Sequence, residues 1–195
     1  MTTRLGLWAR IVAPFAAAIA SVTALAMIAA AHDTDVTDPN DARGPLDVRA
    51  VRLAHDGRPP QWTIETFGRW SIFEIWDRGF FEVLIDTRRG PPPEYYVLVR
   101  STRTRLRGSL WRNHDPGPDT RLGRVAVRHP SLRRVRITLG LSRLRFPDRR
   151  DFYRWSVHTV FTSSRCPRSC HDVAPNGGPV LQWLPGRSPT PTSSG

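Results

Sequence analysis

Alternating hydrophobic and polar positions are the strongest pattern in this chain, and they are clearest between Ser131 and His171. Two apolar stripes with a period of two residues occur there: Val135, Ile137 and Leu139, then Trp155, Val157, Thr159 and Phe161. Arginine, threonine, serine and histidine fill the alternate positions, as expected for β-strands with one buried face. Between these strands, Leu141 and Leu144 suit a single helical turn, which Pro147 ends.

The same pattern recurs in six shorter segments nearer the N-terminus. They span residues 46–51, 62–67, 80–87, 95–101, 106–111 and 125–127. Two of them, 80–87 and 95–101, are apolar on both faces, which is typical of strands in the middle of a sheet. The aromatic-rich segment 68–79 fits either a bent strand or a crossover. About eight short strands without a long amphipathic helix predict an all-β fold, an antiparallel, jelly-roll-like β-sandwich with one short helical turn.

Residues 1–31 have the layout of a signal peptide. Arg4 and Arg10 precede an uncharged apolar run, and three alanines before His32 fit the cleavage pattern, so we expect cleavage there. The alternative is an uncleaved membrane anchor, because the run approaches the roughly 20 residues that span a bilayer. Either reading predicts a domain outside the cytoplasm, secreted or associated with the cell wall. An acidic linker (32–45), the sandwich domain (46–185) and a disordered tail (186–195) are expected to follow.

The acidic stretch after the signal segment raises the question of a metal. Its aspartates, with the one that opens the next element, are Asp33, Asp35, Asp38, Asp41 and Asp47. Carboxylate and loop carbonyl oxygens are the ligands that calcium prefers, so a structural calcium is chemically possible. The spacing does not match the Asp-x-Asp-x-Asp-Gly calcium loop. A solvated linker without metal is therefore the alternative, and no other cofactor is expected.

The charge is strongly positive and is carried by arginine alone. The chain of 195 residues has 29 basic residues, all arginine, against 17 acidic ones, for a net charge of +12. Such a balance is typical of proteins that bind nucleic acid or another polyanion. Here the arginines alternate along nearly every strand, which favours the solvated face of a sheet over a dedicated nucleic-acid site. An anionic cell envelope would still attract this surface.

Cys166 and Cys170 are the only cysteines. In a secreted chain an even number of cysteines indicates a disulfide, and here it would close a very short loop. Its expected effect is to fix the local turn after the last long strand rather than to stabilise the whole fold. A metal site would need further ligands, and only His171 and Asp172 stand near.

The sequence carries no recognisable catalytic motif. A Gly-x-Ser-x-Gly nucleophile, a His-Glu-x-x-His zinc motif and a glycine-rich phosphate loop are all absent from the 195 residues. A further hypothesis is that folding brings Asp86, His158 and Asp172 together as acid and base groups. The simpler interpretation is that these three are ordinary surface residues.

A family resemblance is carried by the order of the strand segments. LDVRAV, WTIETF, FFEVLIDT, YYVLVRS, LRGSLWR, VRITLGLSRL and FYRWSVHTVF resemble the sandwiches of the DOMON type and of family 9 carbohydrate-binding modules. The C-terminal part, with Cys-Pro-x-x-Cys at 166–170 and Asp-x-Ala-Pro at 172–175, resembles secreted actinobacterial proteins of unknown function. The resemblance implies sugar binding. The methionine ligand of haem-binding members has no counterpart, because Met1 and Met27 both lie in the signal segment.

Aromatic residues would carry such sugar binding, because a ring face stacks on the apolar face of a pyranose. Trp70, Trp76 and Trp111 are the candidates, while Trp62 and Trp155 lie on apolar stripes and are assigned to the core. We therefore expect a secreted, non-catalytic binding domain for a glycan or an anionic cell-envelope polymer. The alternatives are an extracellular hydrolase and an arginine-rich binder of polyanions or nucleic acid. Contact with a membrane is expected only through an uncleaved signal segment.

Overall fold

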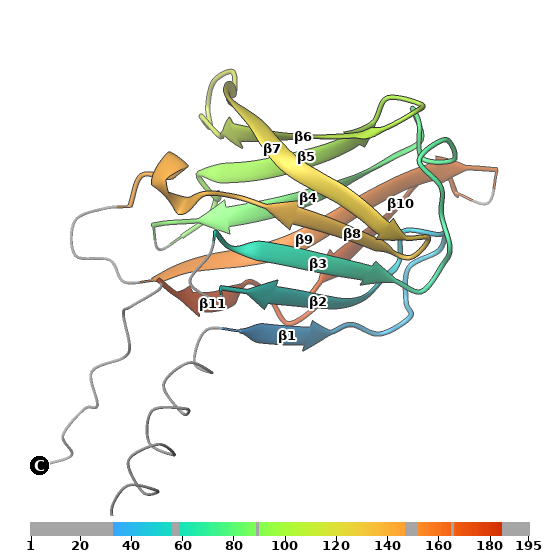
Figure 1. Cartoon of the computed structure of the whole chain (residues 1–195), viewed down its shortest axis with the longest axis horizontal. Helices are drawn as coiled ribbons and strands as arrows, with labels where there is room; N and C mark the ends of the chain where they lie inside the picture. Colours follow the sequence, from blue (N-terminus) through green and yellow to red (C-terminus); the bar gives the residue numbers. More distant parts are fainter. Residues whose placement is uncertain (1–32, 56–58, 89, 147–151, 165, 185–195) are drawn as a thin grey trace, which may run out of the picture. The chain divides into compact units, whose positions relative to one another are not determined.

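Eleven antiparallel strands form one sheet in the computed structural model, which describes residues 33–55, 59–88, 90–146, 152–164 and 166–184 (Figure 1). The strands are β1 (Thr34–Thr37), β2 (Val48–Ala54), β3 (Gln61–Thr66), β4 (Gly79–Asp86), β5 (Tyr95–Ser101), β6 (Leu106–Arg112), β7 (Thr120–Ser131), β8 (Arg134–Thr138), β9 (Phe152–Ser163), β10 (Cys166–Ala174) and β11 (Val180–Trp183). Their order is β1-β2-β3-β8-β7-β6-β5-β4-β9-β10, and β11 pairs with the other end of β9. A 3-10 turn, η1 (Leu141–Arg143), precedes β9.

The long strand β7 connects two halves of this sheet. Its first part, Thr120 to Val125, pairs with β6, whereas Ala126 to Ser131 pairs with β8. Figure 1 shows β7 running obliquely from beside β6 to beside β8. We call β1, β2, β3 and β8 half A, and β4, β5, β6, β9, β10 and β11 half B. The sheet folds over at β7 and curves nearly into a barrel.

A single apolar cluster lies between the two halves. Half A contributes residues such as Val51, Trp62 and Ile137, and half B contributes residues such as Phe81 and Trp155, all at most 1% exposed. The predicted alternation therefore assigned the inward faces of the principal strands correctly. Trp62 and Trp155 are core residues, as predicted.

The all-β antiparallel class and the helical turn are confirmed, but the count of about eight strands is wrong. The three additional strands are β1, β10 and β11, which each pair on one side only. They lie at sheet edges, where polar residues interrupt the hydrophobic alternation.

The expected linker at 32–45 is corrected in part, because Thr34–Thr37 forms β1 and Val36 packs against the core. The signal segment and the tail lie outside the described residues.

The start of β2 departs from strict alternation. Val48 and Val51 both face the core, although they are three positions apart and a period of two would place them on opposite faces. A register shift between Val48 and Ala50 in the β2–β3 ladder explains this, because a bulge changes the phase of the strand. The residue before the strand, Asp47, is also buried, with 2% exposure.

The segment between β3 and β4 is a crossover, which resolves the alternatives left open for residues 68–79. It consists of turns and carries the chain from half A to half B. Trp70 and Ile75 point into the core, at 1% and 0% exposure, whereas Phe73 and Trp76 are exposed. The Ser101 hydroxyl donates a hydrogen bond to the Ile72 carbonyl and so fixes the crossover to the end of β5.

Side-chain hydrogen bonds join the N-terminal part of half A to β9, β10 and β11. The Thr34 hydroxyl donates to Gln182 Oε1 at 2.6 Å, and the Thr159 hydroxyl donates to the Leu46 carbonyl at 2.8 Å. The backbone amide of Val48 donates to Asp172 Oδ2 at 2.6 Å. We call this line of contacts the seam. It closes the curved sheet on the side opposite β7.

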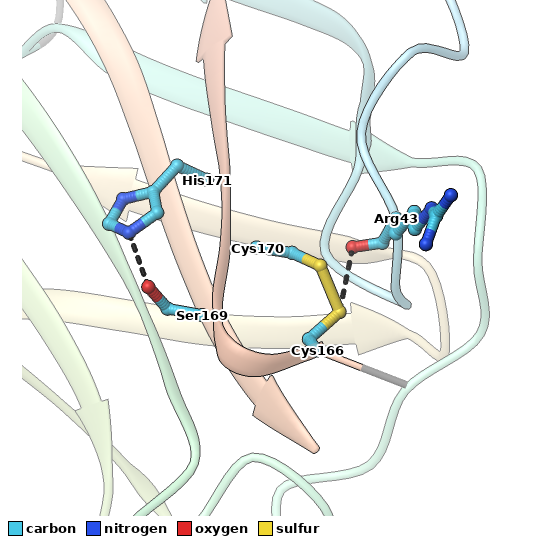
Figure 2. Close-up of a disulfide and its surroundings, with 5 residues drawn as sticks. All are labelled: Arg43, Cys166, Ser169, Cys170 and His171. Carbon is cyan, nitrogen blue, oxygen red and sulfur yellow. Dashed lines mark hydrogen bonds between the residues drawn. A yellow bond between two sulfur atoms is a disulfide. The ribbon is translucent and has the colours of Figure 1, made fainter. Parts of the chain in front are cut away.

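The predicted disulfide between Cys166 and Cys170 is present (Figure 2). It closes a bulge in β10, since four residue steps from Cys166 to Cys170 face only two steps from Ser163 to Phe161 on β9. Cys166 Sγ lies 3.6 Å from the Arg43 carbonyl oxygen, next to the seam. A disulfide sulfur has no proton to donate, so this is a close polar contact rather than a conventional hydrogen bond.

Replacing both cysteines by serine should cost no more than about 2 kcal/mol of unfolding free energy, because the closed loop is among the shortest possible. Urea unfolding of the two proteins measures the difference. The amides of β10 around the bulge should meanwhile lose protection from hydrogen exchange. A loss above about 4 kcal/mol would contradict a purely local role for the disulfide.

Candidate functional site

The outer face of half B brings chemically diverse side chains into three parallel rows. From β10 to β7, the middle row reads Val173, His158, Glu82, Leu98, Ser109 and Arg124. The flanking rows read Ser156, Leu84, Tyr96, Trp111 and Arg121 on one side, and His171, Val160, Phe80, Arg100 and Arg107 on the other. These residues alternate with the core residues of the same strands, so the packing of half B positions them.

Tyr96 and Trp111 form an aromatic pair on this face. Their rings are parallel to within 2° and their centroids lie 6.1 Å apart, which fits an offset arrangement. Both side chains are held by hydrogen bonds: the Tyr96 hydroxyl donates to Asp119 Oδ2, and Trp111 Nε1 donates to the Ser109 hydroxyl. Burial and then the Asp119 hydrogen bond raise the pKa of Tyr96, so the hydroxyl stays protonated. Both rings are half-buried, with part of each open to solvent.

A hollow of about 770 Å³ lies beside this pair, and five exposed arginines line it. We call it the arginine groove, and its arginines are Arg100, Arg105, Arg107, Arg121 and Arg124. Within the described part of the chain, none of the five guanidinium groups forms an ion pair. By contrast, Arg134 and Arg49 on half A both pair with Glu65. Alternation on neighbouring strands has thus gathered arginines in one place.

Glu82 and His158 are cross-strand neighbours at the centre of the face. Burial raises the pKa of Glu82, although the nearby Arg100 charge lowers it in part. Burial also lowers the pKa of His158, against the raising effect of Asp172. Both groups are therefore shifted towards their uncharged forms. The same face also carries the exposed Arg100, Arg107, Arg121 and Arg124.

A second aromatic group is exposed in the crossover between β3 and β4. Trp76 is 37% exposed and Phe73 60%, and the Arg103 guanidinium lies 5.2 Å and 5.6 Å from their ring centroids. These distances fit cation–π contacts. The next residue, Asp77, lines the groove. Trp76 is therefore an exposed aromatic residue next in sequence to a residue of the groove.

Trp70 has to be removed from the predicted ligand-binding residues. It is 1% exposed and packs on the His129 ring, with centroids 4.0 Å apart, and on Phe81. The crossover directs this side chain inward, where it fills the space in the core between half A and half B. Of the three predicted tryptophans, only Trp76 and Trp111 reach the surface.

The structure separates the five aspartates that were considered for calcium. Asp33 and Asp35 lie beside Arg52 and pair with it. Asp38, Asp41 and Asp47 instead converge, and Asp172 of β10 joins them from the other end of the chain. Asp172 is a residue that the sequence pattern did not connect with this stretch.

Asp86, His158 and Asp172 do not assemble into an acid and base set. Asp86 and His158 line one hollow of about 330 Å³, but Asp86 sits beside Arg154, four residues along β9 from His158. Its carboxylate accepts the backbone amides of Arg88 and Gly90. Asp172 is buried on the inner side, whereas the neighbouring Val173 lies beside His158 on the outer face.

Sequence reasoning missed Glu82, Tyr96 and the groove arginines as members of one site. Their outward direction follows from alternation, but their proximity depends on the register between strands, which alternation does not define.

No family model, no curated protein and no solved structure matches the chain. The resemblance to DOMON and family 9 carbohydrate-binding domains thus stays a prediction. Among the described residues, none forms a helix long and apolar enough to span a membrane.

Proposed function

We propose that this chain is a secreted, non-catalytic binding module that holds an anionic glycan, or a related anionic polymer of the cell envelope, on the outer face of half B. The observation that carries the proposal is the arginine groove: five arginines around one hollow, without ion-pair partners among the described residues, next to an aromatic pair.

The free guanidinium groups favour an anionic ligand. Guanidinium forms paired hydrogen bonds with carboxylate, sulfate or phosphate, and such charge-assisted bonds are stronger than neutral ones. A side chain already held by a protein carboxylate has less to offer a ligand, which distinguishes Arg100 and Arg107 from Arg134. Arg100 also lies over the Phe80 ring, 5.7 Å from its centroid, which limits its freedom before binding.

The aromatic side chains favour a polymer that contains sugar rings. Trp111 is the cross-strand neighbour of Arg121 and stacks with Tyr96, and Trp76 precedes Asp77; both Arg121 and Asp77 line the groove. Tyr96 and Ser101 are five residues apart on β5, so the face between them is about 17 Å long. A ligand of that length would contact both aromatic groups and the arginines between them. This supports a chain of several sugar units rather than a single small molecule.

A location outside the cytoplasm is part of the proposal. The Cys166–Cys170 disulfide supports it, because disulfides persist in oxidising compartments and are rare in the cytosol. The signal-peptide pattern at residues 1–31 supports it from the sequence. There, anionic cell-envelope polymers are the ligands that a basic groove would meet.

A matched pair of triple substitutions tests the groove. Arg100→Gln, Arg107→Gln and Arg124→Gln together remove three groove charges. Arg69→Gln, Arg128→Gln and Arg133→Gln remove three exposed charges outside the groove. We expect the groove variant to bind an acidic polysaccharide such as heparin about 10 to 100 times more weakly, since 1.4 kcal/mol corresponds to a factor of ten. The control should bind within about threefold of wild type. Equal losses in both variants would reduce the interaction to general electrostatic attraction.

The same titration, made with other polymers, separates the alternatives. Single-stranded DNA tests a general polyanion site, and its binding should fall more steeply with salt than that of the polysaccharide. Trp111→Ala should weaken polysaccharide binding at low and high salt alike, with circular dichroism as the check on folding. Equal affinity for DNA would favour the polyanion alternative. Turnover of any polysaccharide offered would overturn a non-catalytic role.

A further inference from the structure

Four aspartates from two distant parts of the chain meet beside the seam. Asp38 and Asp41 follow β1, Asp47 precedes β2, and Asp172 lies in β10. Asp38, Asp41 and Asp172 present oxygens that lie within 4.8 Å of one another. Asp38, Asp47 and Asp172 are buried, at 6%, 2% and 5% exposure. This grouping does not depend on the function proposed for the outer face of half B.

Buried carboxylate oxygens without hydrogen-bond partners point into this cluster. Among the described residues, no donor makes a regular hydrogen bond to either oxygen of Asp47 or to Asp38 Oδ2, although the Ala42 amide lies close enough to Asp47 to lower its pKa in part. Burying such a group without a partner costs several kcal/mol. Among the described residues, no arginine or histidine forms an ion pair with any of the four. The cluster thus gathers four carboxylates, three of them buried, without a cationic partner among the described residues.

The remaining oxygens are held in place by donors around the cluster. Asp172 accepts the backbone amides of Val48 and Val173, at 2.6 Å and 2.8 Å. Asn176 donates its backbone amide to Asp38 Oδ1 and its side-chain amide to Asp41 Oδ2, at 3.2 Å and 2.6 Å. Hydrogen bonds of this kind orient carboxylates that bind a metal.

We propose that Asp38, Asp41 and Asp172, with Asp47 beside them as the fourth carboxylate, form a binding site for one calcium ion. The donor set consists of oxygen alone, which suits a hard cation rather than zinc or copper. Calcium accepts six to eight oxygens in variable geometry, whereas magnesium requires a near-ideal octahedron. Four carboxylates on loops and a strand edge fit the calcium requirement better.

A proton shared between Asp47 and Asp172 is the competing account of the same geometry. Two ionised carboxylates only accept hydrogen bonds, so a direct bond between them needs one proton. Burial, and then the charges of Asp172 and Asp41, raise the pKa of Asp47 to about 6. A bound cation or a bound proton would reduce this electrostatic repulsion between the carboxylates. The two accounts differ in their response to added calcium.

Calcium titration of the full chain, followed by calorimetry and thermal unfolding, tests the proposal. After EDTA treatment and dialysis, we expect one calcium ion to bind per chain and to raise the melting temperature by several degrees, with a weaker response to magnesium. Asp47→Asn should reduce calcium affinity at least tenfold, yet leave the metal-free protein as stable as wild type, because it removes a buried charge. Asp35→Asn, which alters an exposed aspartate outside the cluster, is the matched control and should bind calcium normally.

Two results would overturn the site. If millimolar calcium neither binds nor changes the melting temperature, the shared proton explains the cluster. If Asp47→Asn and Asp38→Asn both bind calcium as tightly as the Asp35→Asn control, the ion lies elsewhere. Neither result bears on polysaccharide binding by the arginine groove, which the groove variants test separately.

Discussion

Replacing Trp155 by alanine should lower the free energy of unfolding by about 3 to 5 kcal/mol, the range found for large buried aromatic side chains. Trp155 is 1% exposed and lies in β9 between Ile85 of β4 and Val180 of β11. Truncation would therefore leave a cavity that rigid neighbouring strands cannot fill. Urea unfolding, with an unchanged slope as the sign of an intact folded state, measures the loss.

Trp76→Ala is the matched control for this prediction. It removes the same side chain from an exposed position, where it contacts Arg103 and Phe73. We expect a change below about 1 kcal/mol. A Trp155→Ala protein as stable as this control would mean that β9 presents its other face to the core.

Gly108→Val should destabilise the protein by about 1 to 3 kcal/mol or more through overpacking. A Cβ atom at Gly108 would lie 2.5 Å from Val127 Cγ2 and 2.9 Å from the Val125 carbonyl oxygen. Both contacts belong to β7, at the place where it leaves β6 and crosses towards β8. Side chain and backbone would both have to move. Thermal unfolding of the variant measures the effect.

The control for this substitution is Gly177→Ala. A Cβ atom there meets nothing within 4 Å, so stability should remain within about 0.5 kcal/mol of wild type. If Gly108→Val were equally neutral, β7 would have to lie further from β6 than the structure places it.

Much of the fold is predictable from the local pattern, because strands with one buried face alternate hydrophobic and polar residues in the sequence. Val135, Ile137 and Trp155 are examples, and all three are buried. The edges are not predictable in this way. Strand β1 (Thr34–Thr37) is short and contains one apolar residue, and β10 carries a bulge. Neither strand therefore shows the continuous apolar stripe by which a buried strand is predicted. Pairing with an existing strand makes them part of the sheet.

The candidate sites were harder to predict, for a different reason. Trp70 and Trp76 stand six residues apart in one crossover, yet one is buried and the other exposed, and no period in the sequence separates them. Likewise, Asp172 lies 125 positions from Asp47 in the chain, and only closure of the sheet brings them together. Proximity of this kind depends on tertiary structure rather than on local preference.

The uninterrupted course of β7 affects how the molecule unfolds. Its 12 residues supply hydrogen bonds to both halves, and the two halves share one apolar cluster, so separating them removes the core of each. We therefore expect the described part of the chain to unfold as one cooperative unit, with fraying confined to edge strands such as β1 and β11. A ligand on the outer face of half B consequently stabilises half A as well, although it touches none of it.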